Sequence, residues 1–93
     1  MREKYVESKL VKAVKMSGGL CIKFVSPSWD GVPDRIVLLP KGRIAFVETK
    51  QTGEKMRPLQ KRRQRQLESL GFSVYCLDNA EQIKELLDEI RSV

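Results

Sequence analysis

An acidic residue and a lysine stand two positions apart near the middle of the sequence, a short distance after an aspartate. Glu48 and Lys50 lie in an apolar segment, so on a strand their side chains project from the same face. Ile44 and Phe46 share that face, which predicts a row that begins as core, where an unpaired carboxylate is costly. Asp34 opens the preceding apolar segment. An ammonium beside carboxylates that hold a metal can stabilise negative charge developing on a phosphate.

The distance between the two acids depends on the turn at 40–42. If all three turn residues form the loop, Asp34 lies directly opposite Glu48, with Cβ atoms about 4.5–5.5 Å apart. Carboxylates at that distance repel, and a hard divalent cation between them removes the conflict. A two-residue turn would shift the register and take Asp34 out of line. The sequence leaves both registers open.

A third acid precedes this hairpin. Glu7 lies on or beside the apolar face that Val6, Leu10 and Val14 would form on a helix. It either joins the acidic site or pairs with Lys4 or solvent at the helix edge.

The elements that position these residues follow from hydrophobic periodicity and from turn residues. The pattern predicts helices over about 2–17 and 58–70, and a last helix capped by Asp78 or Asn79 with an apolar stripe behind it. It predicts strands over 20–25, 34–39, 43–50 and 73–77. The order αβββαβα indicates one α/β domain over 1–93, with a mixed central sheet flanked by helices.

The charge is unevenly distributed. The chain carries +6 overall, but the segment 41–65 alone carries a net charge of +7, which favours a polyanionic partner, either nucleic acid or a membrane surface. In that segment Lys55, Arg57, Lys61, Arg62, Arg63 and Arg65 are candidate phosphate contacts. Trp29, in a loop rich in proline and serine, either stacks on a base or covers the end of the sheet.

Composition excludes several classes of site and of protein. The sequence has no histidine, which excludes histidine-ligated zinc and a histidine general base. Cys21 and Cys76 form no CxxC pair and are expected to be buried thiols. No apolar run is long enough to cross a bilayer and none resembles a secretory signal, so we expect an intracellular, cytoplasmic protein without a membrane partner.

The segment 31–35, Gly-Val-Pro-Asp-Arg, followed by Val-Glu-Thr-Lys at 47–50, resembles the PD-(D/E)xK nuclease superfamily and, more narrowly, its virus-type replication-repair nuclease (VRR-NUC) family. The resemblance extends to Glu7, Gly18-Gly19 and Gln60, and so covers nearly the whole chain. It implies a restriction-endonuclease-like αβββαβ core followed here by a C-terminal helix. It also implies Mg²⁺ or Mn²⁺ held by Asp34, Glu48 and the backbone carbonyl of Thr49. Lys50 is then catalytic, Glu7 and Gln60 complete the catalytic group, and Glu7 is also available to the metal.

We therefore expect a metal-dependent endonuclease that hydrolyses phosphodiester bonds in DNA, acting at four-way (Holliday) junctions or other branched structures. The alternative is a non-catalytic nucleic-acid-binding protein that keeps the nuclease fold. A homodimer is expected because stand-alone members of the family are expected to be dimers, and Tyr5, Trp29 and Met56 lie at positions predicted to be exposed. The number of metal ions and the identity of the general base stay open.

Overall fold

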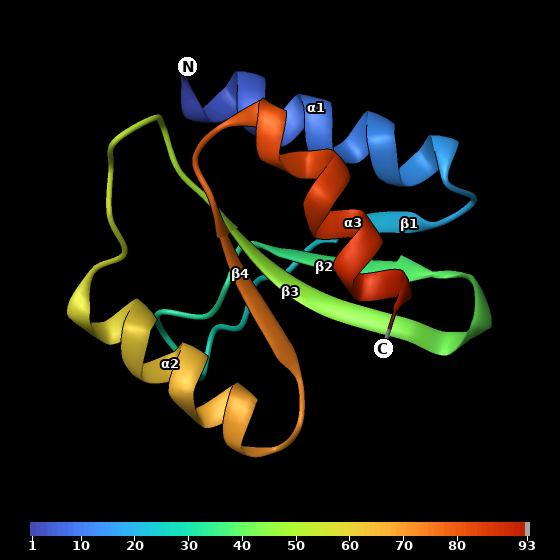
Figure 1. Ribbon diagram of the computed structural model, residues 1–93. Coiled ribbons are helices and arrows are strands. Elements are labelled where there is room, and N and C mark those ends of the chain that lie inside the picture. The colour runs from blue at the N-terminus through green and yellow to red at the C-terminus, as the bar shows by residue number, and fades with distance from the viewer. Residues whose placement is uncertain (93) are drawn as a thin grey trace.

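The computed structural model describes residues 1–92, which form a four-stranded sheet with helices on both faces (Figure 1). The strands are β1 (Leu20–Lys23), β2 (Arg35–Leu39), β3 (Arg43–Thr49) and β4 (Ser73–Leu77), and they lie in the order β1-β2-β3-β4. The first three form an antiparallel meander, whereas β4 is parallel to β3. The predicted α/β fold with a mixed sheet is confirmed.

The main core lies between the sheet and two helices. α1 (Glu3–Met16) and α3 (Ile83–Arg91) pack side by side against one face (Figure 1). Alternation along the strands sends Val37, Ala45 and Val47 into this core, where they are fully buried. The helices contribute Val6, Leu10, Val14, Ile83, Leu86, Leu87 and Ile90.

α2 (Pro58–Ser69) connects β3 to the parallel strand β4 and covers part of the other face. Leu67 of this helix packs on Phe46 and Val74 in a second, smaller core. The remainder of this face is open: Leu20 is 62% exposed, Ile22 44% and Ile44 39%. The predicted row Ile44–Phe46 is therefore not part of the main core, because its face has only α2 to cover it.

The turn between β2 and β3 decides the register. Pro40–Gly42 forms a short 3-10 turn, so that Leu39 pairs with Arg43 and Arg35 with Val47. The same register places Asp34, one residue before β2, opposite Glu48. The three-residue loop is the correct alternative, and the two-residue turn is wrong. Lys41 closes the turn with a φ of 70°, in the left-handed region.

Several boundaries and exposures differ from the expectations. β1 ends at Lys23, two residues early, and a 3-10 turn (Ala80–Gln82) precedes α3, capped by Asn79 accepting the Glu81 N–H at 2.9 Å. The thiols are not both buried: Cys21 is half-buried and Cys76 is exposed, because it lies on the open face of β4. Among residues 1–92, no helix is long and apolar enough to span a membrane.

Candidate active site

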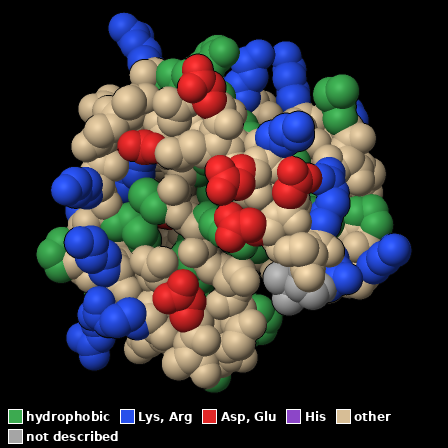
Figure 2. All heavy atoms as spheres, viewed as in Figure 1, with side chains coloured by type: hydrophobic (Ala, Val, Ile, Leu, Met, Phe, Trp, Pro, Cys, Tyr) green, Lys and Arg blue, Asp and Glu red, His purple; other side chains and the backbone are tan. Residues whose placement is uncertain are grey.

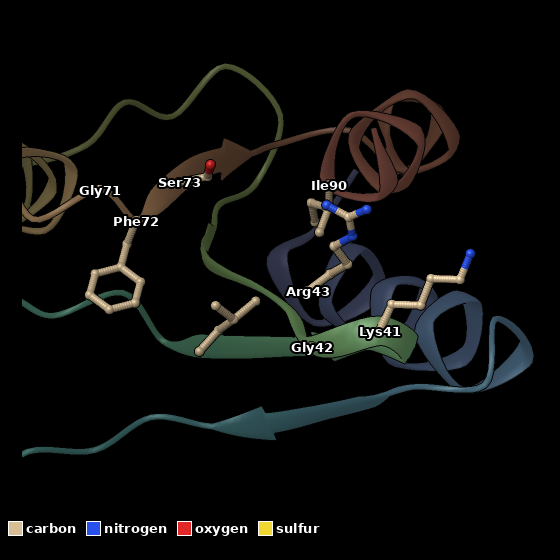
Figure 3. Close-up of a pocket in the computed structure, with 8 residues that line it drawn as sticks. Lys41, Gly42, Arg43, Gly71, Phe72, Ser73 and Ile90 are labelled. Carbon is tan, nitrogen blue, oxygen red and sulfur yellow. The ribbon is translucent and has the colours of Figure 1, made fainter. Parts of the chain in front are cut away.

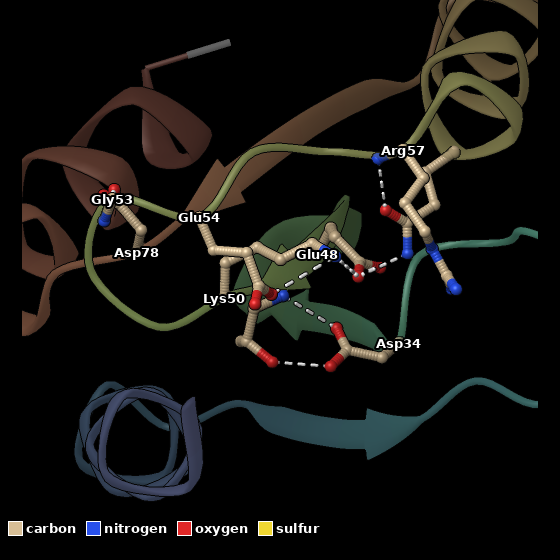
Figure 4. A network of polar contacts seen from close by, with 9 residues as sticks. Asp34, Glu48, Lys50, Gly53, Glu54, Arg57 and Asp78 are labelled. Atoms are coloured by element: carbon tan, nitrogen blue, oxygen red, sulfur yellow. Dashed lines mark hydrogen bonds and ion pairs between the residues drawn. The ribbon is translucent and has the colours of Figure 1, made fainter. Parts of the chain in front are cut away.

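The predicted acids and the lysine meet where β2 begins and β3 ends (Figure 4). Asp34 precedes β2, Glu48 and Thr49 end β3, and Lys50 follows directly. Asp34, Glu48 and Lys50 line a cleft of about 400 Å³ whose other walls come from the loop 24–32 and from the start of α2. The cleft therefore brings the predicted acids and Lys50 together with Gln60 of α2.

Glu48 is the most perturbed acid of the site. Its carboxylate is buried, and Oε2 accepts a hydrogen bond from Gln60 Nε2 at 2.9 Å. Lys50 Nζ lies 3.6 Å from the same oxygen. Burial raises the pKa of Glu48 to about 7, and the neighbouring charge of Asp34 adds to this effect while Lys50 opposes it. A carboxyl of this kind is better tolerated when a cation neutralises it.

Asp34 is held by a single residue. Thr49 donates to its carboxylate twice, from the backbone N–H at 2.9 Å and from the hydroxyl at 2.5 Å. Burial raises the pKa of Asp34, the two Thr49 hydrogen bonds lower it, and the charge of Glu7 raises it further. Asp34 therefore lies opposite Glu48 in register, as predicted, with its carboxylate bonded to Thr49 (Figure 4).

The ammonium of Lys50 is buried between two carboxylates. Glu54 Oε1 lies 3.6 Å from Nζ, the same distance as Glu48 Oε2. Glu54 belongs to the loop 51–57, which Asp78 fixes by accepting the Gly53 N–H at 3.1 Å (Figure 4). Sequence reasoning missed Glu54, and its only signal was its position four residues after Lys50.

Gln60 is a site residue, not a helix-surface glutamine. It is buried, and besides donating to Glu48 it accepts the Arg57 N–H through Oε1 at 2.9 Å. The side chain thus caps the start of α2 and ties that helix to the acidic centre. Because one amide makes both bonds, moving α2 would also move Glu48.

Glu7 pairs with Arg35 of β2 and not with Lys4. Arg35 Nε donates to Glu7 Oε2 at 2.9 Å, and Arg35 Nη1 donates to the Cys21 carbonyl at 3.2 Å. Glu7 is near enough to raise the pKa of Asp34. Its role as a metal ligand or catalytic group stays a prediction. Sequence reasoning also missed Arg35, although a charged residue inside an apolar strand was a visible signal.

The basic residues of α2 fall into two groups. Arg63 is occupied: Nε donates to the Asp30 carbonyl at 2.6 Å, and the guanidinium lies 4.9 Å from the Trp29 ring centre. Trp29 is half-buried against the second core, which favours its predicted role in covering the sheet end. The other basic candidates are exposed and form no ion pair within residues 1–92; they are Lys55, Arg57, Lys61, Arg62 and Arg65.

The strongly basic segment 41–65 does not form one surface. Lys41 and Arg43 line a hollow of about 270 Å³ with Phe72 and Ile90, at the opposite end of β3 from the acids (Figure 3). Figure 2 shows acidic side chains gathered over α3, with Lys and Arg around the margin of that face. Of the basic residues in this segment, Lys50 and Arg57 line the acidic cleft, and Lys61, Arg62 and Arg65 follow on α2.

The donor set at the cleft fits a divalent cation with an incomplete protein shell. Mg²⁺ is commonly held by one or two carboxylates, with water and substrate phosphate oxygens completing the shell. Asp34 and Glu48 are two such carboxylates, and burial raises the pKa of each. Within residues 1–92, no group of three or more His, Cys, Asp or Glu side chains could enclose a metal. A site of this kind leaves coordination positions for substrate.

Comparison with known proteins adds two findings to this geometry. The chain is 49% identical over 79 residues to the protein named "Putative nuclease p44" of Acyrthosiphon pisum secondary endosymbiont phage 1, covering 85% of each chain. A solved structure described as "VRR_NUC domain" superposes with a TM-score of 0.86 at 30% identity, covering 92% of this chain and 94% of that one. The chain belongs to the VRR-NUC family. No family model matches it.

This VRR-NUC protein is therefore a nuclease, a hydrolase of nucleic acid. The resemblance stated from the segments 31–35 and 47–50 is confirmed, and so is the restriction-endonuclease-like core. The acids, the lysine and the glutamine lie together at one cleft.

Proposed function

We propose that this VRR-NUC protein is a Mg²⁺- or Mn²⁺-dependent endonuclease that hydrolyses phosphodiester bonds in DNA, at four-way junctions or other branched structures. The observation that carries the proposal is the buried carboxylate of Glu48 and the half-buried carboxylate of Asp34, beside the buried ammonium of Lys50. Such a group is unfavourable in an empty cleft and suited to a bound cation and a phosphate.

Each residue of the cleft has a separate role in the proposed reaction. Asp34, Glu48 and the Thr49 carbonyl would hold the divalent ion, which when bound polarises a phosphate and lowers the pKa of a coordinated water. Gln60 keeps the Glu48 carboxylate in place through its 2.9 Å hydrogen bond. Lys50 lies within 3.6 Å of that carboxylate and would stabilise negative charge developing on the phosphate.

The exposed basic residues next to the cleft support DNA as the substrate. Arg57 lines the cleft, and Lys61, Arg62 and Arg65 follow it on α2. Each such contact with a phosphate would release counterions, so binding should weaken steeply with salt. An acidic cleft beside a basic helix is an arrangement that a binding-only protein would not need.

The open half of the sheet supports a homodimer. Leu20, Ile22 and Ile44 present exposed apolar side chains on one continuous face beyond the reach of α2. Two symmetric incisions at a four-way junction require two active sites, which a two-fold dimer of one chain supplies. The apolar face, rather than Trp29 or Met56, would form the contact, because both of those residues are half-buried.

One set of reactions tests the cleavage proposal. The protein is incubated with linear, flapped and four-way DNA in Mg²⁺, in Mn²⁺ or in EDTA, beside a Glu48→Ala variant and the exposed control Glu85→Ala. We expect cleavage of branched DNA by the wild type and the control with metal, and none by Glu48→Ala. Cleavage in EDTA, or no cleavage of any DNA, would overturn the proposal.

Subunit mixing tests the dimer. Light scattering at micromolar concentration should give twice the chain mass. With an excess of Glu48→Ala, mixed dimers should nick one strand of a junction that the wild type cuts twice. A monomeric mass, or paired cuts at every mixing ratio, would contradict the dimer.

A further inference from the structure

We propose that Thr49 is a positioning residue whose side-chain hydroxyl fixes the Asp34 carboxylate in the orientation that the divalent ion requires. The inference rests on the proposed metal dependence. It gives the threonine side chain a role separate from that of its backbone carbonyl.

The first observation is that one residue holds both oxygens of Asp34. The Thr49 N–H donates to Oδ1 at 2.9 Å and the Thr49 hydroxyl donates to Oδ2 at 2.5 Å. A single hydrogen bond leaves a carboxylate free to rotate about its last torsion. Two hydrogen bonds from one rigid strand end fix the plane of the group, and the second depends on the identity of the side chain.

The second observation is the place of the hydroxyl in the fold. Thr49 continues the core-facing row of β3 after Ala45 and Val47, and it is fully buried beside Leu77 of β4. An apolar residue of the same shape would fill this position without a polar group to satisfy. Within residues 1–92, the Thr49 hydroxyl donates its hydrogen bond to Asp34. The buried hydroxyl therefore holds the Asp34 carboxylate in place.

Thr49→Val keeps the shape of the side chain and the backbone bond, and removes only the hydroxyl. Oδ2 of Asp34 then loses its donor and the carboxylate can rotate away. Partners that orient metal ligands typically contribute 10–100-fold to metal affinity. We therefore expect Mn²⁺ to bind Thr49→Val at least tenfold more weakly than the wild type, and Thr49→Ser to restore most of the affinity.

The experiment is calorimetric titration of the DNA-free protein with Mn²⁺, for the wild type and three variants. Val47→Ala is the matched control, because it loosens the same buried row of β3 without touching an acid. It should lose stability and keep its Mn²⁺ affinity. DNA affinity in EDTA should be equal in all four proteins, and kcat at limiting metal should fall for Thr49→Val without a change in KM for DNA.

The outcomes separate this inference from the proposed function. Equal Mn²⁺ affinity for Thr49→Val and the wild type would overturn the positioning role and leave the metal-dependent nuclease intact. Equal weakening in Val47→Ala would also overturn it, because general loosening of the strand would then be the cause. A wild type that binds no Mn²⁺ and cleaves without metal would overturn both.

Discussion

Glu48→Gln removes the charge of the central acid while keeping its shape and its capacity to hydrogen bond. In the wild type, burial and Asp34 raise the pKa of Glu48 from the ordinary 4.5 to about 7. Between about pH 4.5 and pH 7 the folded protein therefore binds a proton at this position that the unfolded chain has already released. The variant is neutral at every pH and lacks this effect.

The sign and the size follow from linkage. For an acid whose pKa is raised by folding, the free energy of unfolding falls as the pH rises from about 4.5 to about 7 and is constant above it. At 1.36 kcal/mol per pKa unit, the upper limit of this loss is about 3.4 kcal/mol. Local relaxation reduces the penalty of a buried charge, so we expect about 2 kcal/mol.

Urea unfolding in EDTA at pH 5 and pH 8 measures this difference. From pH 5 to pH 8, the free energy of unfolding of Glu48→Gln should rise by about 2 kcal/mol relative to that of the wild type. The exposed control Glu85→Gln should show no such relative change. Saturating Mg²⁺ at pH 8 should stabilise the wild type, by about 2.7 kcal/mol at 100 times Kd, and leave Glu48→Gln unchanged. A difference between variant and wild type that is the same at both pH values would refute the reasoning, because Glu48 would then not titrate differently on folding.

Three further predictions concern side chains around the cleft. Lys50→Ala should lower kcat by roughly 10²–10³-fold with little change in DNA affinity, measured by single-turnover cleavage and by binding in EDTA; a matched loss of affinity would make Lys50 an ordinary phosphate contact. Arg62→Ala should weaken DNA binding and flatten its salt dependence, whereas Arg63→Ala should chiefly lower the thermal stability, since Arg63 already binds the loop carbonyl of Asp30; equal effects of the two on the salt slope would contradict this division. Glu54→Gln should lower KM for DNA up to about fivefold, because Glu54 is exposed, its ion pair contributes about 1 kcal/mol at most, and we expect a phosphate to replace it at Lys50; an unchanged KM would show that substrate does not displace Glu54.

The sequence predicts most of the fold because its local signals agree. Alternation along β2 and β3 and the turn at 40–42 were sufficient to place Asp34 opposite Glu48, once the three-residue loop was chosen. The structure was needed to choose between the two turns, because Lys41 adopts a left-handed backbone conformation. A lysine rarely adopts this conformation, so the residue type does not predict it.

The contacts made at a distance could not be predicted. The partner of Glu7 is Arg35, 28 positions away, and no periodicity links a helix residue to a strand residue of opposite charge. Arg63 is a second example. Its charge predicted a phosphate contact, whereas its guanidinium donates to the loop carbonyl of Asp30, 33 positions away. Exposure of Ile44 and Cys76 was missed because alternation shows that a strand has two faces and does not show how much of each a helix covers.

The sheet topology has a consequence for the order in which the site assembles during folding. Asp34, Glu48 and Thr49 belong to one hairpin, and hairpins form in about 1–10 μs. We expect Gln60 to reach its position later. It lies on α2, which is fixed only when β4 pairs in parallel with β3, and a pairing across such a long connection forms slowly. We therefore expect the two acids to meet in the folding transition state before their amide partner is present. Mg²⁺ should accordingly increase the refolding rate in stopped-flow experiments, whereas Gln60→Ala should act mainly on the unfolding rate.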